Sequence, residues 1–187
     1  FNLEGRSETQ PLADAVDPDR NPYPTVWSSS CDEPLIGRDE GATARTKQVR
    51  VQLEPAWDDP AVVAARSRAA AEQGARVLII RNTVRLAVAT QCAIEAEAPD
   101  LGLRVRGPDG AMVPSPHHAR FAPEDRRLLD RALEDAFGKA RRADGGIIGV
   151  ATQTAEQSLD IDADLLITDL CPADVLLQRI GRLHRHG

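Results

Sequence analysis

The arrangement of apolar strands and helices along the chain predicts an α/β fold, with a parallel sheet that is covered by helices on both faces. Three short runs rich in Val, Leu and Ile, at residues 76–80, 147–151 and 165–168, have the composition of buried parallel strands. Helical segments separate and follow them, as crossover connections require. Alternating side chains predict a further strand over residues 49–53, and residues 99–112 are rich in turn formers.

Four helices are expected, and their limits follow from capping residues and apolar spacing. Acidic residues and a first-turn proline at residues 58–60 favour a helix start, and Gly74 ends that helix. Further along, Leu129, Leu133 and Phe137 form a single apolar stripe at helical spacing. The expected helices span residues 58–73, 83–97, 123–137 and 172–186.

Composition separates an N-terminal segment from the folded domain. Residues 1–47 are acidic, rich in proline and without periodicity, which predicts an irregular connector or extension, whereas residues 48–187 form the α/β domain. The net charge of −6 arises entirely within the first 60 residues, so the domain itself has no basic excess. Any contact with nucleic acid must therefore come from a local patch.

Some kinds of site are disfavoured by the sequence. The three cysteines lie far apart, with no C-x-x-C pair and no histidine at ligand spacing, so neither a metal site nor a disulfide framework is expected. No apolar run approaches about 18 residues, so no membrane-spanning helix and no membrane partner is expected. The chain begins with phenylalanine and is interpreted as one part of a longer protein.

The C-terminal segment carries the clearest functional pattern, Q-x-x-G-R-x-x-R. On a helix, Gln178, Arg182 and Arg185 would share one face, where two forked guanidiniums suit the phosphates of a nucleotide. Gly181 between them would allow another backbone or a phosphate to approach closely, whereas Arg179 would point about 100° away. The apolar residues expected to pack on the sheet are Leu176, Ile180 and Leu183. The alternative is a solvated basic face near a helix C-terminus.

Two other segments place polar residues after buried strands, where parallel α/β proteins bind ligands. Thr152 and neighbouring backbone N–H groups are candidates to grip a phosphate, and Asp160 is a candidate to accept from a ribose hydroxyl. Asn82 and Thr83 stand where a strand turns into a helix, so a helix cap or a DNA phosphate contact is expected there. The alternative for residues 152–162 is a loop capped by its own polar side chains.

These segments resemble the motifs of superfamily 2 helicases. The C-terminal pattern resembles motif VI, and residues 152–162 resemble motif V, in the version of the CRISPR-associated helicase-nuclease of type I systems. The sequence R-N-T-V at residues 81–84 is similar to a further motif of that family. H-H-A-R-F at residues 117–121 resembles its His-Ser-Arg-Phe, with Ala119 in place of serine. The resemblance covers residues 48–187.

The resemblance implies a second RecA-like lobe, which is the C-terminal lobe of a helicase. In that family, arginines matching Arg182 and Arg185 act as arginine fingers, and the glutamine matching Gln178 helps to place the attacking water. Asp160 would contact the nucleotide together with Gly181. The implied contacts to the DNA backbone are Asn82, Thr83, His118, Arg120 and Thr152.

Cofactors and partners are implied by what the chain lacks. It contains no G-x-x-x-x-G-K-[ST] phosphate loop, no D-E-x-[HD] sequence after an apolar strand and no His-Asp dipeptide. The resemblance therefore implies that ATP and Mg²⁺ are held mainly by a first RecA-like lobe in the same polypeptide, and that this chain alone is inactive. Single-stranded DNA and the CRISPR surveillance (Cascade-type) complex are the implied partners, in antiviral defence within the prokaryotic cytoplasm.

Alternative functions stay open at this stage. The chain could belong to another superfamily 2 DNA helicase or translocase, or it could be a RecA-like module that binds nucleic acid or a partner without hydrolysis. The presence of both Arg182 and Arg185 disfavours the binding module, which has no need for the pair. A standalone nucleotide-binding protein is disfavoured because the phosphate loop is missing.

Overall fold

The computed structural model describes residues 47–185, except residues 56–57, 108, 140–144 and 157–158. The expected connector of residues 1–47 therefore lies outside the described residues, apart from Lys47. Among the described residues, no helix combines the length and the apolar character needed to cross a membrane.

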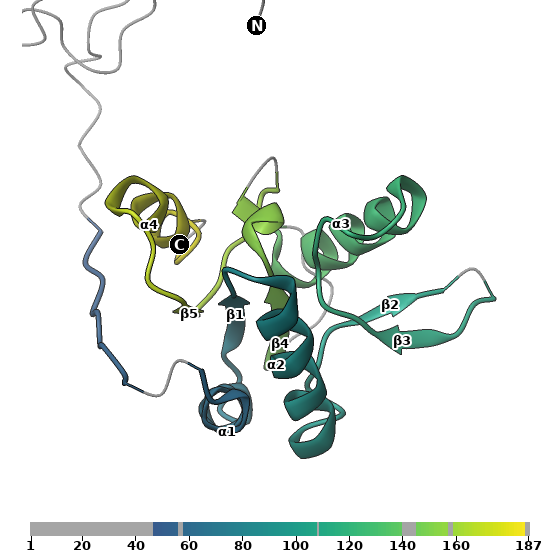
Figure 1. The fold of residues 1–187 in the computed structure, drawn as a ribbon, viewed down its shortest axis with the longest axis horizontal. Coiled ribbons are helices and arrows are strands. Elements are labelled where there is room, and N and C mark those ends of the chain that lie inside the picture. Colours follow the sequence, from purple (N-terminus) through teal and green to yellow (C-terminus); the bar gives the residue numbers. More distant parts are fainter. Residues whose placement is uncertain (1–46, 56–57, 108, 140–144, 157–158, 186–187) are drawn as a thin grey trace, which may run out of the picture. The chain divides into compact units, whose positions relative to one another are not determined.

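Helices alternate with strands along the domain (Figure 1). In chain order the elements are α1 (Pro60–Ala71), β1 (Arg76–Ile80), α2 (Val84–Glu97), β2 (Arg104–Arg106), β3 (Met112–Pro114), α3 (Pro123–Phe137), β4 (Ile147–Ala151), the 3₁₀ helix η2 (Gln153–Glu156), β5 (Leu165–Thr168) and α4 (Ala173–Ile180). Three strands form a parallel sheet in the order β4-β1-β5. At its carboxyl edge, Ile80 of β1 lies opposite Ala151 and Thr168. The parallel α/β fold predicted from the sequence is confirmed.

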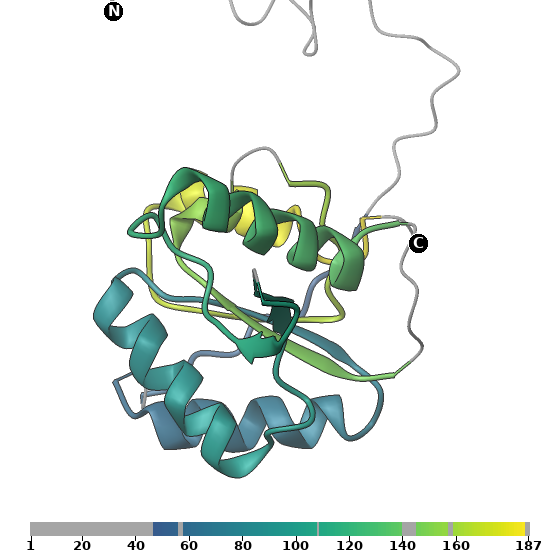
Figure 2. The same cartoon turned by 90° about the vertical axis from the view of Figure 1, so that its right-hand side faces the viewer.

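Both faces of this sheet are covered, by α1 and α2 on one side and by α3 and α4 on the other (Figure 2). The alternation of side chains along β1 explains the two layers. Val77 and Ile79 pack into a cluster with residues of α1 and α2, whereas Leu78 and Ile80 pack with residues of α3. All four side chains are fully buried. Because β1 is the central strand, it anchors both cores.

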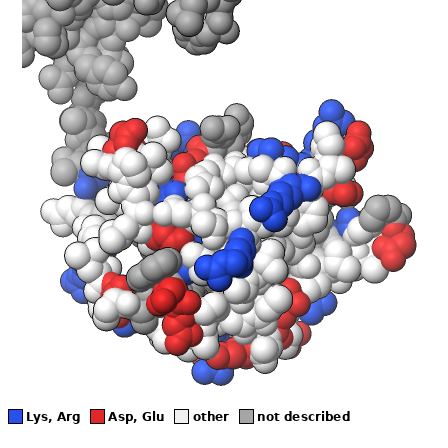
Figure 3. All heavy atoms as spheres, in the orientation of Figure 1, with Lys and Arg blue, Asp and Glu red and all other residues white. Residues whose placement is uncertain are grey.

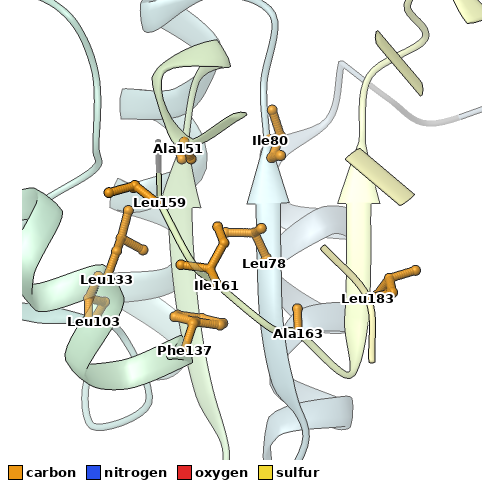
Figure 4. Packing of buried hydrophobic residues seen from close by; sticks show 11 residues of the cluster. Leu78, Ile80, Leu103, Leu133, Phe137, Ala151, Leu159, Ile161, Ala163 and Leu183 are labelled. Atoms are coloured by element: carbon orange, nitrogen blue, oxygen red, sulfur yellow. The ribbon is translucent and has the colours of Figure 1, made fainter. Parts of the chain in front are cut away.

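The segment between η2 and β5 runs back across the α3 side of the sheet. Its odd-numbered residues Leu159, Ile161 and Ala163 are buried in the same cluster as Leu78 and Phe137. Figure 4 shows them in a row, from the carboxyl end of the strands toward the amino end. This segment therefore joins the two ends of the sheet, and it brings the chain to the start of β5.

Local signals set the helix limits largely as expected. Asp59 caps α1 by accepting a hydrogen bond from the N–H of Ala61 at 2.9 Å, and Gly74 leaves the helix with a φ of 91°. Thr83 caps α2 through its side-chain oxygen. The stripe expected on α3 is buried, and it consists of Leu129, Leu133 and Phe137.

One expected strand is absent, and one hairpin was not expected. Residues 49–53 form no strand, and the side chains of Val51 and Leu53 are exposed. An alternation of apolar and polar side chains forms a strand only where a neighbouring strand supplies hydrogen-bond partners. Among the described residues no strand pairs with this segment. Conversely, the turn-rich residues 99–112 contain β2 and the start of β3, which pair as an antiparallel hairpin. The turn formers mark the tip of that hairpin, where Gly110 has a φ of 84°.

The last helix is shorter than predicted. It ends at Ile180 instead of continuing to residue 186. The chain beyond it pairs with the segment before β5: Ala163 N–H donates to Arg182 O at 2.8 Å, and His184 N–H donates to Ala163 O at 3.1 Å. His184 reaches a positive φ of 44°. A tertiary pairing therefore replaces the last turns of the expected helix.

Candidate nucleotide and nucleic-acid interface

Three of the residues predicted to contact DNA lie at the carboxyl edge of the sheet. Asn82 and Thr83 follow β1, and Thr152 follows the neighbouring strand β4. Gln153 Nε2 donates to Asn82 O at 2.9 Å, which ties the two strand ends together. Thr83 is exposed, and its Oγ1 accepts from Leu86 N–H at 3.2 Å. Thr83 therefore caps α2 and is also accessible from outside the protein.

Two of these candidates are held by protein contacts. The hydroxyl of Thr152 belongs to a side chain that is only 2% exposed, and it lies 3.3 Å from Thr154 Oγ1. The backbone N–H of Asn82 donates to Asp169 Oδ2 at 2.7 Å, and its Nδ2 donates to Leu170 O at 2.8 Å. These contacts fix the edge of the sheet, and they leave Thr83 as the more accessible hydroxyl.

His118 and Arg120 occupy the loop before α3. The His118 ring stacks on Phe121, with centroids 4.4 Å apart, and its Nδ1 accepts from Arg120 N–H at 3.3 Å. Burial lowers the pKa of His118 below its ordinary value, and the positive charge of Arg120 also lowers it. The neutral form of the imidazole is therefore favoured near neutral pH. The Arg120 residue is exposed.

A hydrogen-bonded relay behind this loop was missed by the sequence analysis. His117 is 1% exposed, and its Nδ1 lies 2.6 Å from Thr154 Oγ1. Its Nε2 lies 2.6 Å from Asp130 Oδ1 of α3. The relay links α3 to the residues that follow β4. The two adjacent histidines gave no signal of it because their partners are remote in sequence.

The candidate nucleotide residues converge beside the segment between η2 and β5. Arg185 Nη1 lies 3.3 Å from Asp160 Oδ1, and both side chains are about half exposed (46% and 58%). Arg182 donates from Nη2 to Glu156 O at 2.6 Å and from Nη1 to Leu159 O. Burial lowers the pKa of Arg182, and the neighbouring charge of Arg185 lowers it further. Two guanidiniums and a carboxylate are thus gathered at one place.

The way in which these residues converge differs from the prediction. Only Gln178 lies on α4, where it is exposed, because the helix ends before Arg182 and Arg185. The three residues therefore do not share one helical face. Gly181 is the C-cap of α4, and the atoms nearest to its position belong to its own helix. Apart from its chain neighbours, no described residue from outside α4 comes closer than 3.9 Å to a Cβ built at Gly181, and its expected contact with a phosphate stays a prediction.

Arg179, which was expected to lie off the functional face, is 1% exposed and makes a dense set of contacts. Its Nε donates to Glu156 Oε1 at 2.7 Å, and its Nη2 donates to Asn82 Oδ1 at 3.1 Å. Its Nη1 donates to Thr168 Oγ1 at 2.5 Å and to Asp169 O at 3.2 Å. We call the set to which it belongs the carboxyl-edge cluster, which comprises Arg81, Asn82, Glu156, Asp169 and Arg179.

A second buried group, the amino-end cluster, lies at the other end of β1 and comprises Arg76, Asp162 and Asp164. Arg76 Nε donates to Asp164 Oδ2 at 3.1 Å, and its Nη2 lies 3.7 Å from Asp162 Oδ2. Burial alone would raise the pKa of Asp164, but the hydrogen bonds and charge of Arg76 lower it below its ordinary value. Asp162 Oδ1 also accepts from Arg185 N–H at 2.7 Å. The amino-end cluster thereby holds the backbone of Arg185.

On the side shown in Figure 3, basic side chains lie next to each other near the centre, whereas most acidic side chains lie toward the rim of the described surface. Within the part of the chain that the structure describes, no group of three or more His, Cys, Asp or Glu residues is placed to hold a metal ion. Cys92 and Cys171 are free thiols, and Cys31 lies outside the described residues.

A solved structure defines the class of protein. The structure titled "Crystal structure of T. fusca Cas3-AMPPNP" is similar with a TM-score of 0.56 and 32% identity, over 74% of this chain and 15% of that chain. The parallel sheet with helices on both faces corresponds there to a RecA-like lobe of a helicase. The fold and the class implied by the sequence motifs are therefore confirmed.

Sequence comparison names the family. Residues 73–187 match the family model described as CRISPR-associated nuclease/helicase Cas3, C-terminal, and the chain belongs to this family. The CRISPR-associated endonuclease/helicase Cas3 of Escherichia coli (strain K12) is 43% identical over 122 residues, which is 65% of this chain and 12% of that protein. The protein of the same name from Thermus thermophilus is 56% identical over 69 residues, 37% of this chain and 8% of that protein. The chain thus spans a small part of its relatives and forms a CRISPR-associated helicase lobe.

Proposed function

We propose that this chain is the second motor lobe of an ATP-dependent DNA helicase or translocase of CRISPR interference. ATP would lie between this lobe and a first RecA-like lobe of the same polypeptide. The observation that carries the proposal is the gathering of Arg182, Arg185 and Asp160 at one place, from segments about 20 residues apart. The complex of a similar protein named with AMPPNP, an ATP analogue, supports nucleotide use.

The chemistry assigned to these residues is electrostatic. The Arg185 guanidinium is half exposed and pairs with the exposed carboxylate of Asp160 at 3.3 Å, a pairing that is weak in water. A γ-phosphate offers more charge and a fork-matched geometry, so Arg185 would stabilise the charge that develops during phosphoryl transfer. Arg182 would act beside it. The exposed amide of Gln178 would help to place the attacking water, and Asp160 would then be released to bind the ribose.

Magnesium would be held outside this lobe. The D-E-x-[HD] sequence whose acids would hold Mg²⁺ beside the phosphates is absent from this chain, which supports placing the ion on the first lobe. When it is bound by the first lobe, the ion would neutralise charge between the β- and γ-phosphates. This chain would contribute cationic side chains to the same transition state, and no described residue of it is assigned to the metal.

DNA would be gripped by its backbone at the carboxyl edge of the sheet. Thr83 and Arg120 are exposed, so we assign them the direct phosphate contacts. Asn82 and Thr152 are engaged with protein partners and would hold the edge in shape, while His118 would donate from Nε2. Contacts restricted to the backbone suit a motor, because a motor must move along DNA of any sequence. The surveillance complex of CRISPR immunity is the proposed partner, in the prokaryotic cytoplasm.

The experiment measures ATP turnover by the complete protein and by this chain alone, with and without single-stranded DNA. We expect DNA-stimulated turnover in the complete protein and none above background in the isolated chain, since phosphoryl transfer needs the phosphate loop and metal-binding acids. Absence of DNA-stimulated turnover in the complete protein would instead favour a non-catalytic binding module.

The DNA contacts are tested by the salt dependence of binding. In the complete protein, Thr83→Ala and Arg120→Ala should weaken binding of single-stranded DNA of any sequence. The loss of the Arg120 charge should also lower the slope of log affinity against log salt by about 0.7, the value for one phosphate contact on a single strand. Arg127→Ala, at an exposed arginine of α3, is the matched control. An unchanged slope in Arg120→Ala contradicts the assignment.

A further inference from the structure

Arg179 stands between the two candidate sites and belongs to neither. Its side chain is buried, and each guanidinium nitrogen donates to a different segment. Nε donates to Glu156 of η2, Nη1 to Thr168 and Asp169 at the end of β5, and Nη2 to Asn82 after β1. An arginine that only neutralised one buried acid would need a single partner. This one is shared among three segments, each of which reaches a candidate functional residue.

On the nucleotide side, Glu156 makes the connection. Its carboxylate accepts from Arg179 Nε at 2.7 Å, while its backbone carbonyl accepts from Arg182 Nη2 at 2.6 Å. One residue of η2 therefore binds both the buried arginine and a proposed arginine finger. A shift of Glu156 relative to α4 necessarily changes the donor geometry of Arg182.

On the DNA side, Asn82 makes the connection. Its Oδ1 accepts from Arg179 Nη2 at 3.1 Å, and its backbone oxygen accepts from Gln153 Nε2 at 2.9 Å. Asn82 directly precedes Thr83, the exposed residue assigned to a DNA phosphate. A movement of this strand end on binding DNA is therefore transmitted to Arg179 within one residue.

We propose that Arg179 is a positioning residue that couples DNA binding at the carboxyl edge to the arginine fingers. The proposal rests on the proposed function. The rigid planar fork of the guanidinium holds Asn82 and Glu156 in one fixed relation, and burial penalises any state in which one of these donors loses its acceptor. DNA that orders Asn82 would thereby order Glu156, and with it Arg182.

The test compares Arg179→Lys with wild type in the complete protein. Lysine keeps the positive charge but is a point donor without the fork, so it cannot hold the three segments together. The readout is the DNA stimulation, meaning turnover with saturating oligo-dT divided by turnover without DNA, alongside the Kd for oligo-dT and thermal melts. We expect the stimulation to fall by about 5- to 150-fold, the usual range of coupling between sites, and by more than the DNA affinity changes.

Two further variants sharpen the result. Glu156→Gln keeps the backbone carbonyl used by Arg182 but weakens the acceptor of Arg179, so it should also lower the stimulation. If Arg179→Lys does not fold, the stimulation of Glu156→Gln by DNA tests the coupling role instead. Arg127→Lys, at an exposed position of α3, is the control for arginine-to-lysine exchange and should keep the wild-type ratio.

Other outcomes separate the two claims. If wild type is stimulated by DNA and both Arg179→Lys and Glu156→Gln keep that stimulation, the coupling role is overturned while the motor function stands. The same holds if turnover with and without DNA falls in parallel with the melting temperature, because a purely structural role has that effect. If wild type itself shows no stimulation, the proposed function fails, and this inference fails with it.

Discussion

Strand β1 begins with a buried arginine and is followed by another, and the two arginines are held differently. At the amino end, Arg76 pairs with Asp164, whose side chain is 33% exposed. Beyond the carboxyl end, Arg81 pairs with Asp169, and both side chains are almost fully buried (2% and 5%). Arg76 also lies 3.7 Å from Asp162, and both of those side chains are 8% exposed, so water reaches the amino-end cluster chiefly at Asp164. We infer that the pairing of Arg76 with Asp164 tolerates the loss of a partner better than the pairing of Arg81 with Asp169.

The largest effect is expected at Arg185, whose backbone the amino-end cluster holds. In the complete protein, Arg185→Ala should lower DNA-stimulated ATP turnover by about 10³–10⁵, the usual value of an arginine finger. The free energy of unfolding should change by only about 0.5 kcal/mol, because the side chain is 46% exposed. Kinetics and thermal melts on the same preparations provide the measurement.

Two companions complete that experiment. Arg185→Lys should restore little turnover, since an ammonium group cannot fork onto two phosphate oxygens. Arg131→Ala, at an exposed arginine of α3, should behave as wild type. Near-normal turnover in Arg185→Ala, or a collapse of its melting temperature, would contradict the arginine-finger role and make Arg185 a structural residue.

The next largest effect concerns Asp169. Asp169→Ala removes the carboxylate beside buried Arg81 and the acceptor of Asn82 N–H. Breaking a buried ion pair in this way typically costs about 3–5 kcal/mol. Denaturant unfolding should show this loss, with about 0.5 kcal/mol or less for Asp135→Ala at an exposed site of α3. A loss below about 1 kcal/mol in Asp169→Ala would show that the buried pairing with Arg81 contributes little to stability.

A smaller loss is expected at Asp164 of the amino-end cluster. Asp164→Asn should cost about 1 kcal/mol at neutral pH, because its partly exposed pairing with Arg76 is screened by water. The pKa of Asp164 is lowered below 3.8 in the folded protein, so the contribution is complete above 3.8 and disappears as the pH falls through the lowered pKa. The unfolding free energies of wild type and Asp164→Asn should therefore converge in strong acid. A difference that persists there contradicts the pairing.

The smallest effect is a shift in titration. Since burial lowers the pKa of His118, its ring should titrate below 6.5 in an NMR experiment on the free protein. The folded state then binds fewer protons than the unfolded state, so this histidine lowers stability as the pH falls below 6.5. A nearby DNA phosphate favours the charged ring, so binding should raise the pKa. No change on saturation with single-stranded DNA removes His118 from the DNA contacts.

Local patterns were sufficient to predict much of the fold. The stripe of Leu129, Leu133 and Phe137 and the buried strands depend on spacing within one segment, and each lies where the sequence places it. The caps of α1 and α2 are equally local. Residues 49–53 were misjudged because alternation carries no information about a pairing strand.

The site depends on contacts that no local pattern contains. Arg179 and Asn82 are 97 residues apart, and Arg76 and Asp164 are 88 apart, so their pairing appears only in the folded chain. The gathering of Arg185 with Asp160 agrees with the roles expected for both residues. They come together in a different way from the shared helical face that was predicted. The helix α4 ends at Ile180, and the residues after it pair with Ala163. The functional roles of these residues stay predictions.

The stretch from Leu159 to Asp164 has a consequence for the lengths of chain that the domain can accept. Leu159, Ile161 and Ala163 belong to the apolar core, whereas Asp160 is exposed and Asp162 is buried beside Arg76. At about 3.3 Å per residue the stretch spans roughly 17 Å. Inserting or deleting one residue within it would turn Ile161 outward and bring a carboxylate into the apolar layer, and it would also shift the pairing of Ala163 with Leu183. Among functional members of this family, substitutions should therefore accumulate in this stretch while its length stays constant. Its length thus fixes the distance between the residues that follow β4 and the start of β5.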